Sequence, residues 1–232
     1  MKVSVVVPTY NEREIIRRLI KSILKIAPNV AEVIVVDDNS PDGTWKIVKK
    51  MIEKNKSIKL LRRINKKGLA SAIFDGVSMA KGDIVVWMDA DFSHPPKLLP
   101  KLIRELNVYD ISIASRYAKG GKDSREFFRV LTSKLINLQA QILLSSKIKD
   151  YTTGFVAVNR YVFDKIQFIP KGYGEYCIEF LYLSIKRGFK IKEIPYTNIK
   201  RMTGKTKALS DISNYLRHIL AYSSIIFKLR MK

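Results

Sequence analysis

Two aspartates separated by one residue offer the clearest chemistry in this chain. Asp89 and Asp91 follow the apolar run 84–88, which has the composition of a buried strand. In an extended chain, residues two apart point to the same side, so both carboxylates can share one cation. Oxygen ligands suit Mg²⁺ or Mn²⁺, which keep several waters and accept phosphate oxygens. Solvated turn aspartates are the alternative, and the position after an apolar strand favours the metal.

The first two predicted strands also end in polar residues. Pro8, Tyr10 and Glu12 follow one of them, and Asp37 and Asp38 follow the other. A proline and a tyrosine can wall a planar ring, and carboxylates can accept hydrogen bonds from a base or a ribose. One of the two adjacent aspartates could instead cap the next helix. Acidic residues number 21 against 43 Lys and Arg, so their concentration at these strand ends favours a binding site.

A basic segment late in the chain carries glycine and threonine between its cations. Residues 200–207 read Lys-Arg-Met-Thr-Gly-Lys-Thr-Lys. A loop of this composition can fold over phosphate groups, which arginine and lysine bind through charge-assisted hydrogen bonds. An exposed basic loop without a ligand is equally compatible with the composition alone.

Strand and helix patterns alternate through the first half of the chain. Apolar, β-branched runs predict strands at 3–7, 32–36, 58–61, 84–88 and 111–114, with helices at about 12–25, 44–54, 68–80 and 96–106. We expect Thr44 to cap the second helix. This alternation predicts an open α/β fold with a mostly parallel central sheet covered by helices. Ligands bind such sheets at the carboxyl ends of the strands, where the candidate residues stand.

The second half is less regular. Helix patterns cover 127–144, 176–187 and 209–229, a strand covers 190–194, and 156–163 mixes strand with turn. The first and last of these helices are amphipathic. Because no linker or internal repeat interrupts the chain, we expect a single domain over 1–232.

Composition excludes several classes of protein. The chain has 232 residues, 47% of them hydrophobic, which argues against disorder. One cysteine and two histidines argue against a disulfide scaffold and against Cys-rich or multi-His metal sites. The net charge of +22 predicts an anionic partner: nucleic acid, a phosphorylated small molecule or a membrane surface. We expect no signal peptide and no membrane span, since the apolar stretch 219–227 is shorter than the roughly 20 residues required.

Four motifs in order resemble the inverting glycosyltransferases of family 2, which have the GT-A (nucleotide-diphospho-sugar transferase) fold. They are Val-Val-Val-Pro-Thr-Tyr-Asn-Glu at 5–12, Val-Val-Asp-Asp-Asn-Ser-Pro-Asp-Gly-Thr at 35–44, Lys-Gly-Leu-Ala-Ser-Ala at 67–72 and Met-Asp-Ala-Asp at 88–91. The finer resemblance is to the dolichyl-phosphate mannose synthases, through 91–96, 114–117, 150–155 and 201–207. It spans about residues 2–220.

This resemblance implies roles for individual residues. The nucleotide sugar would bind Pro8, Tyr10, Glu12, Asp37, Asp38, Asp89, Ala90, Asp91 and Arg116, with Arg201 and Lys207 closing over it. Asp89 and Asp91 would hold the Mg²⁺ or Mn²⁺ that bridges the diphosphate. Arg129 and Ser133 would hold the lipid phosphate, so the catalytic set is Asp91, Arg116, Arg129 and Ser133. Residues 1–116 would then form the nucleotide-sugar-binding half, and 117–232 the acceptor-binding half with membrane-facing helices.

The implied reaction is the inverting, metal-dependent transfer of mannose from GDP-mannose to dolichyl or another polyprenyl phosphate. A phosphate nucleophile is already charged near neutral pH, because its second pKa is about 6, so no general base is needed. The implied partners are GDP-mannose or another nucleotide sugar, the polyprenyl phosphate, a membrane surface and a membrane-anchoring subunit, with no nucleic acid. The protein would be peripheral, on the cytoplasmic side of a membrane. The amphipathic helices suit such a surface, although covering the sheet explains them equally well.

Some residues depart from the family pattern, and two other functions stay open. Ser93 stands where some members carry Gln, Thr153 and Thr206 stand for Ser, and 172–176 lacks the Phe-Gln of many members. One alternative is hexosyl transfer from a UDP-sugar to a polyprenyl phosphate or to a saccharide, for which Glu175 or Glu179 would be the base. The remote alternative is a nucleic-acid-binding module centred on the cations of 56–67, which the acidic strand ends oppose.

Overall fold

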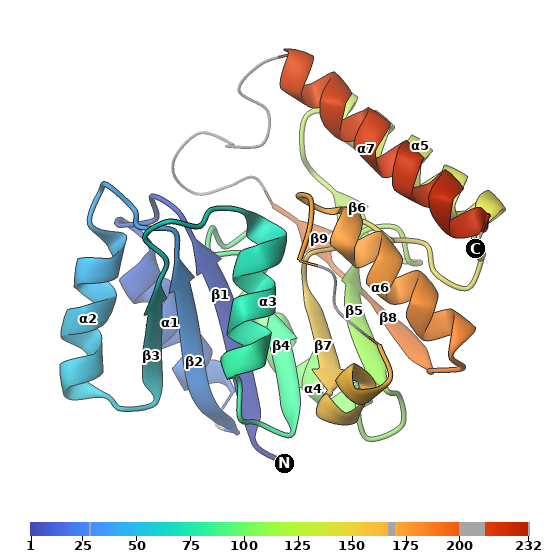
Figure 1. Cartoon of the computed structure of the whole chain (residues 1–232). Helices are drawn as coiled ribbons and strands as arrows, with labels where there is room; N and C mark the ends of the chain where they lie inside the picture. The colour runs from blue at the N-terminus through green and yellow to red at the C-terminus, as the bar shows by residue number, and fades with distance from the viewer. Residues whose placement is uncertain (28, 167–169, 200–211, 232) are drawn as a thin grey trace.

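Strands rich in valine and isoleucine form the centre of the molecule. The computed structural model describes residues 1–27, 29–166, 170–199 and 212–231 (Figure 1). The sheet has the order β3-β2-β1-β4-β7-β5-β8. Its strands are β1 (Val3–Thr9), β2 (Val30–Asp37), β3 (Ile58–Arg62), β4 (Ile84–Trp87), β5 (Ile111–Ser115), β7 (Val156–Asn159) and β8 (Ile191–Pro195). Every residue of β1 and β4 is buried, which their near-continuous hydrophobic sequences require.

The α/β fold with a mostly parallel sheet is confirmed. β1 runs parallel to β2 and β4, β2 runs parallel to β3, and β5 runs parallel to β8. β7 is antiparallel to both of its neighbours, β4 and β5. It is inserted between two strands that precede it in the sequence, so the alternation of strands and helices alone could not place it.

Helices cover both faces of this sheet (Figure 1). On one face, α1 (Ile16–Ile26), α2 (Thr44–Lys54) and α4 (Leu99–Glu105), which follows the short helix η1 (Pro96–Leu98), pack against Val3, Val5 and Val7. On the other face, α3 (Leu69–Met79) and α6 (Glu175–Lys186) pack against Val6 and Trp87. The alternation of β1 side chains between the two clusters is the period-two pattern of a strand. A second short helix, η2 (Arg160–Asp164), follows β7.

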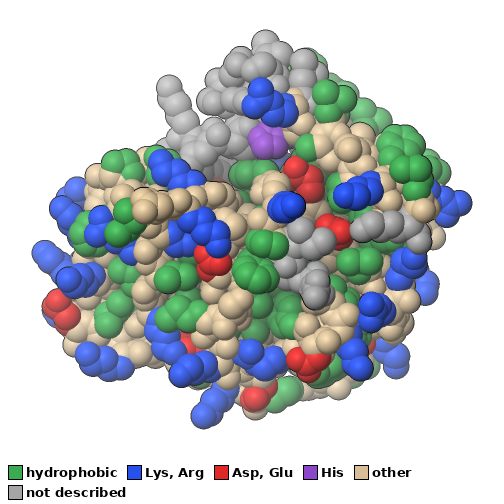
Figure 2. All heavy atoms as spheres, in the orientation of Figure 1, with side chains coloured by type: hydrophobic (Ala, Val, Ile, Leu, Met, Phe, Trp, Pro, Cys, Tyr) green, Lys and Arg blue, Asp and Glu red, His purple; other side chains and the backbone are tan. Residues whose placement is uncertain are grey.

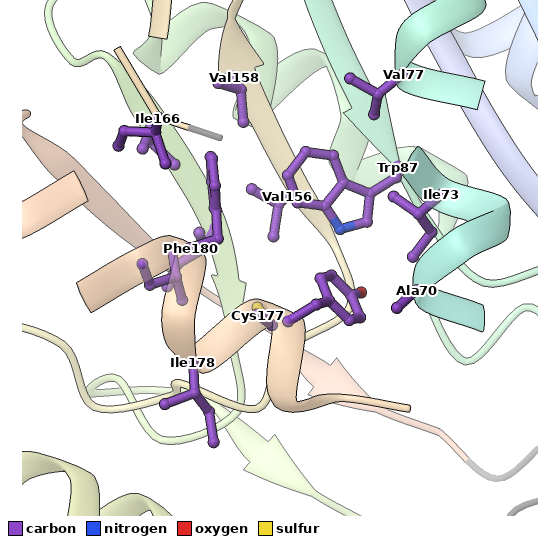
Figure 3. Packing of buried hydrophobic residues seen from close by; sticks show 14 of the residues in the cluster. Ala70, Ile73, Val77, Trp87, Val156, Val158, Ile166, Cys177, Ile178 and Phe180 are labelled. Carbon is purple, nitrogen blue, oxygen red and sulfur yellow. The ribbon is translucent and has the colours of Figure 1, made fainter. Parts of the chain in front are cut away.

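Trp87 at the end of β4 lies in the middle of the second core. Figure 3 shows its indole beside Ile73 and Val77 of α3 and Val156 of β7. The Trp87 and Phe180 rings meet edge to face with centroids 5.7 Å apart, so α6 packs on the same side chain. This packing fixes the end of β4 directly before Asp89.

Two long helices form a separate layer over the C-terminal half (Figure 1). α5 (Phe127–Leu143) lies beside α7 (Ile212–Arg230), and Ser223 Oγ donates to Gln139 Oε1 at 3.0 Å between them. β6 (Lys122–Asp123) and β9 (Thr197–Asn198) pair next to this layer. Exposed hydrophobic side chains gather over it at the upper right of Figure 2. On α5, four exposed apolar side chains form a row that we call the α5 stripe: Leu131, Leu135, Leu138 and Ile142.

Across the described ranges, no helix combines the length and the hydrophobicity needed to cross a bilayer.

Candidate functional site

Three polar strand ends lie at one edge of the sheet. β1 stands between β2 and β4, with Thr9 paired to Asp37 and Val6 paired to Trp87. Since neighbouring strands lie about 4.8 Å apart, the ends of β2 and β4 are roughly 10 Å from each other. The chain leaves β1 for β2 on one side and reaches β4 on the other, which is the topological switch point where open α/β sheets bind ligands.

Asp37 holds two of these strand ends together. Its fully buried carboxylate accepts hydrogen bonds from Thr9 Oγ1 at 2.8 Å, from the Ser40 N–H at 2.8 Å and from Ser40 Oγ at 2.6 Å. Ser40 Oγ in turn accepts from the Asn11 N–H at 3.0 Å. Asp37 is therefore committed to the turn after β2, and of the two adjacent aspartates it takes the structural role.

Asp38 is fixed by an arginine that the sequence analysis assigned only to the nucleic-acid alternative. Arg63 is buried, and its Nε donates to Asp38 Oδ1 at 2.7 Å. The guanidinium also bonds Asp75 Oδ2 at 3.1 Å and Ser71 Oγ at 2.9 Å, while the Gly68 N–H donates to Asp38 Oδ2 at 2.8 Å. The adjacency of β3 to β2 is the signal that could have identified Arg63, because the residue after β3 lies beside the residue after β2.

Glu12, Tyr10 and Pro8 form the β1 side of this edge. Pro8 is buried in the strand, and Lys67 Nζ lies 5.4 Å from the centroid of the half-buried Tyr10 ring. Glu12 is buried, and its N–H donates to Thr44 Oγ1 at 2.9 Å.

The prediction that Thr44 caps α2 is wrong. Asp42 Oδ1 accepts the Thr44 N–H at 2.9 Å, and Gly43, at φ 81°, precedes the helix in a conformation that favours glycine. Thr44 is instead the first helical residue, and its hydroxyl joins α2 to the backbone of Glu12.

Asp89 is oriented by a buried histidine. His94 Nδ1 accepts the Asp89 N–H at 3.0 Å, and His94 Nε2 lies 3.8 Å from Asp89 Oδ2. The imidazole stacks on Phe155 with centroids 5.2 Å apart. A Cβ at Gly154 would stand 3.2 Å from His94 Cε1, so glycine there lets the ring keep this place. The Asp89 carboxylate itself is 40% exposed.

Asp91 completes the carboxylate pair around the buried Ala90. Its Oδ1 accepts from the Ser93 N–H at 3.0 Å and from Ser93 Oγ at 2.6 Å. Carboxylate oxygens on two residues two apart suit a hard divalent cation. In the part of the chain that the structure describes, no three His, Cys, Asp or Glu side chains come together as a metal site. The pair therefore fits an ion that takes its remaining ligands from water and phosphate.

Arg116 is held rigidly next to the loop that carries Gly154. Its Nε donates to Asp150 Oδ2 at 2.8 Å, and its Nη2 donates to Asp150 Oδ1 at 2.6 Å and to Thr152 Oγ1 at 2.7 Å. Burial works against the charged guanidinium, but the charge of Asp150 outweighs it and holds the pKa of Arg116 well above its usual value. Arg116 is thus a fixed positive charge.

Arg129 and Ser133 lie one turn apart on α5. Ser133 Oγ is 3.3 Å from Thr152 Oγ1, the hydroxyl that Arg116 also contacts. Burial and the nearby charge of Arg125 lower the pKa of the half-buried Arg129. An anion between these groups would relieve that repulsion, so the start of α5 suits a phosphate.

Arg201 and Lys207 lie outside the described residues. Of the two carboxylates considered for a base, Glu175 accepts the N–H groups of Tyr173 at 2.7 Å and Gly174 at 2.8 Å, and Glu179 is buried in α6. Several cations of the basic stretch 56–67 form ion pairs within the protein. Lys59 pairs with Glu32, and Lys66 Nζ lies 2.8 Å from Asp75 Oδ1, which weakens the nucleic-acid alternative.

Comparison with known proteins gives consistent matches. Residues 4–167 match the model of Glycosyl transferase family 2. A dolichol-phosphate mannosyltransferase from Pyrococcus furiosus is 41% identical over 226 residues, which are 94% of this chain and 63% of that protein. This chain therefore spans less than two thirds of that relative. The undecaprenyl-phosphate mannosyltransferase of Micrococcus luteus is 33% identical over 91% of this chain and 89% of its own length. The polyprenol monophosphomannose synthase of Mycolicibacterium smegmatis is 33% identical over 88% of this chain and 79% of its own length.

A solved structure supports the fold. The glucosyl-3-phosphoglycerate synthase of Mycobacterium tuberculosis, in complex with Mn²⁺, UDP and glucosyl-3-phosphoglycerate, superposes with a TM-score of 0.71. The alignment covers 99% of this chain and 79% of that one at 20% identity. The predicted GT-A fold is confirmed by this likeness together with the family match.

Proposed function

The chain belongs to glycosyl transferase family 2, and from this premise we propose that it transfers mannose from GDP-mannose to a polyprenyl phosphate with inversion at the sugar. Three relatives that are 33–41% identical over most of the chain carry the names of polyprenyl-phosphate mannosyltransferases. The observation that carries the proposal is the meeting of three acidic strand ends at the switch point of the sheet.

The donor nucleotide binds at the ends of β1 and β2. Pro8 and Tyr10 border the base, Glu12 and Asp38 accept its hydrogen bonds or those of the ribose, and Asp37 holds the turn beneath them. Because Arg63 and the Gly68 N–H already fix the Asp38 carboxylate, this acceptor is in place before the nucleotide arrives. A preorganised acceptor loses little conformational entropy on binding. Residues 1–116 thus form the nucleotide-sugar-binding half.

Asp89 and Asp91 would hold Mg²⁺ or Mn²⁺ beside the diphosphate, with Ala90 between them. A bound divalent cation supplies positive charge to the diphosphate as it leaves. His94 keeps the Asp89 backbone in position through its Nδ1 atom, and Ser93 keeps Asp91 in position. Arg201 and Lys207, which lie outside the described residues, would add further positive charge to the diphosphate.

The acceptor half, 117–232, presents the phosphate nucleophile. Arg116, Arg129 and Ser133 bind the polyprenyl phosphate and offset its repulsion from the anionic donor. Two of them meet at Thr152 Oγ1, which gives the phosphate a defined position. No carboxylate base is needed, because the attacking oxygen is already charged near pH 7. Attack from the side opposite the diphosphate inverts the anomeric carbon.

The polyprenyl chain brings the protein to a membrane surface. The α5 stripe exposes four apolar side chains, and Phe127 and Phe128 extend it at the start of the helix. Lys228 and Arg230 are exposed at the end of α7. An apolar face with flanking cations binds an anionic membrane in the plane of the interface. We infer a peripheral protein on the cytoplasmic side, with a membrane-anchoring subunit as a further partner.

The test is a transfer assay with labelled GDP-mannose, UDP-glucose and UDP-N-acetylglucosamine, a polyprenyl phosphate acceptor, and Mg²⁺ or Mn²⁺ added or withheld. We expect labelled lipid only from GDP-mannose and only with a divalent cation. Asp91→Ala should lower the rate by about a hundredfold or more with the fold intact. Asp164→Ala, an exposed aspartate on η2, is the control and should keep the normal rate. Transfer from a UDP-sugar instead would show that GDP-mannose is not the donor. Normal transfer by Asp91→Ala would refute the metal site.

A further inference from the structure

A pocket of about 490 Å³ lies between α5 and the segment around β6, away from the strand ends. Its wall includes Arg116, Lys122, Lys134 and Lys149, with the amides of Asn137 and Gln141 between them. A volume of roughly 300–1,000 Å³ is typical of pockets that hold small ligands. The lining contains none of the strand-end carboxylates, so among the described site residues it shares only Arg116 with the proposed active site.

The lining of this pocket has a positive net charge, because four Lys and Arg side chains face one acidic side chain. Asp123 is the acidic residue in the lining, and its carboxylate accepts from Arg125 at 2.8 and 2.6 Å and from the Tyr117 hydroxyl at 3.0 Å. Arg116 is 95% buried and places Nη1 3.7 Å from Asp123, beyond hydrogen-bond distance, while Nε and Nη2 bond Asp150 and Thr152. A buried guanidinium therefore borders the pocket, and exposed lysines surround its mouth. Such a set of donors binds a phosphate group.

The helical phase of α5 places this pocket next to the α5 stripe. Val130, Lys134, Asn137 and Gln141 line the pocket at spacings of four, three and four residues, which is one face of a helix. Each residue of the α5 stripe follows one of these residues directly in the sequence. One residue is about 100° of helix rotation, so the pocket-lining row and the apolar row run side by side along α5. A molecule with a phosphate and an acyl chain can contact both rows at once.

We propose that this pocket binds the phosphate headgroup of an anionic membrane phospholipid, whose acyl chains lie beside the α5 stripe. This site rests on the membrane docking proposed above, and it specifies an anionic phospholipid as the lipid that the docked protein binds. The acceptor phosphate is assigned instead to Arg129 and Ser133, neither of which lines the pocket, so Arg116 is the residue at which the two sites adjoin. The bound phospholipid instead sets how α5 sits on the membrane.

The experiment measures co-sedimentation of the full chain with phosphatidylcholine vesicles and with vesicles that also contain phosphatidylglycerol. The double variant Lys134→Glu, Lys149→Glu reverses two charges at the pocket. The control, Lys49→Glu, Lys50→Glu, makes the same change of charge at exposed positions on α2, outside the layer formed by α5 and α7. We expect the pocket variant to bind phosphatidylglycerol vesicles about tenfold more weakly than the control does, with equal binding to pure phosphatidylcholine. Equal losses in the two variants would mean diffuse charge attraction and overturn the proposal.

A second measurement separates this pocket from the acceptor site. Transfer to polyprenyl phosphate is assayed in detergent without phospholipid, where the pocket variant should keep the kcat and the acceptor KM of the unsubstituted protein. A raised acceptor KM in detergent would assign the pocket to the acceptor and overturn the proposal. Failure of the unsubstituted protein to transfer any sugar would refute the proposed function instead, whereas a loss of phosphatidylglycerol binding confined to the pocket variant would still support the headgroup site. Equal thermal unfolding temperatures confirm that the variants are folded.

Discussion

Two arginines near the start of α5 have different surroundings: Arg125 lies two residues before the helix, and Arg129 lies in its first turn. Arg125 is bound to Asp123 through two hydrogen bonds, whereas burial and the charge of Arg125 depress the pKa of Arg129. A charge that is costly in the ligand-free protein gains most from an arriving anion, because the anion removes the repulsion as it binds. This asymmetry makes Arg129 the better candidate for the lipid phosphate.

Replacing Arg129 with alanine tests this role. We expect the KM for polyprenyl phosphate to rise at least tenfold, since a charge-assisted hydrogen bond contributes roughly 1.5–3 kcal/mol. The KM for the nucleotide sugar should stay constant. Arg129→Lys keeps the charge without the planar fork and should recover part of the loss. A change confined to nucleotide affinity would contradict the assignment.

Asp123 predicts a pH dependence of stability. Burial works to raise the pKa of its carboxyl, but the hydrogen bonds and charge of Arg125, together with Arg116, outweigh it and lower the pKa from 3.8 to about 2. A depressed pKa stabilises the folded state above about pH 4, and that stabilisation is lost as the pH falls toward 2. Asp123→Asn should therefore cost about 2 kcal/mol at neutral pH.

Denaturant titrations of Asp123→Asn and the unsubstituted protein at several pH values measure this effect. The difference in unfolding free energy should be constant above about pH 4 and should shrink below it. Asp164→Asn, at an exposed position, should show no such difference. A difference that persists unchanged to pH 2 would assign the stability of Asp123 to something other than its charge.

Sequence reasoning at this scale identified the acidic strand ends but not their partners. Nothing in the adjacent pair Asp37 and Asp38 says which is buried, because that depends on Ser40, Thr9 and Arg63. Arg116 and Asp150 are 34 positions apart in the chain, and their pairing follows from the packing of β5 against β7. Short-range motifs were readable, and contacts made by the sheet were not.

At the scale of elements, α3 depends on a glycine where it crosses the sheet. Gly76 is buried, and a Cβ there would lie 2.3 Å from Val6 Cγ1 and 3.0 Å from Val36 Cγ2. Both atoms belong to central strands, β1 and β2, which lead directly to Glu12 and to Asp37. The close approach of helix and strands therefore supports the edge that carries the site.

Gly76→Ala should destabilise the protein by about 1–3 kcal/mol, the usual effect of overpacking a core. Alanine favours the helix by about 1 kcal/mol over glycine, so the clash must exceed that gain. Ser78→Ala, at an exposed position of the same helix, is the control and should be neutral or slightly stabilising. Denaturant midpoints measure both, and a stabilised Gly76→Ala variant would show that α3 can shift away from the sheet.

The elements of the first half were predictable because most of the buried strands are largely apolar runs between clear turns. The second half was harder for physical reasons. β6 and β9 have two residues each, and such short pairs leave no pattern in the sequence. β7 lies in the segment 156–163, whose sequence mixes strand and turn patterns, and its antiparallel pairing with β4 and β5 is made by residues distant in the sequence.

At the scale of the whole molecule, the distribution of apolar surface defines an orientation. Lys and Arg are scattered over the face in Figure 2, so the net charge of +22 gives attraction to an anionic surface without selecting one side. The α5 stripe supplies the direction, because it is a continuous apolar row on one outer helix. Docking through this stripe places the membrane on the exposed face of α5, whereas Ser133 lies on the buried face of the same helix.

Leu135→Ser with Leu138→Ser tests this orientation. The two side chains are 57% and 51% exposed, so their loss should leave the unfolding temperature nearly unchanged. Burying them in a membrane interface contributes about 1 kcal/mol each, and vesicle binding should weaken at least tenfold. Ile64→Ser with Val108→Ser removes two apolar side chains that are more exposed and lie outside α5, and it should leave vesicle binding intact. Transfer to a lipid acceptor in vesicles should fall with binding, whereas transfer in detergent should not, because the chemistry at Asp89, Asp91 and Arg116 is untouched. If both pairs bind vesicles like the unsubstituted protein, the α5 stripe does not contact the lipid and the orientation is wrong.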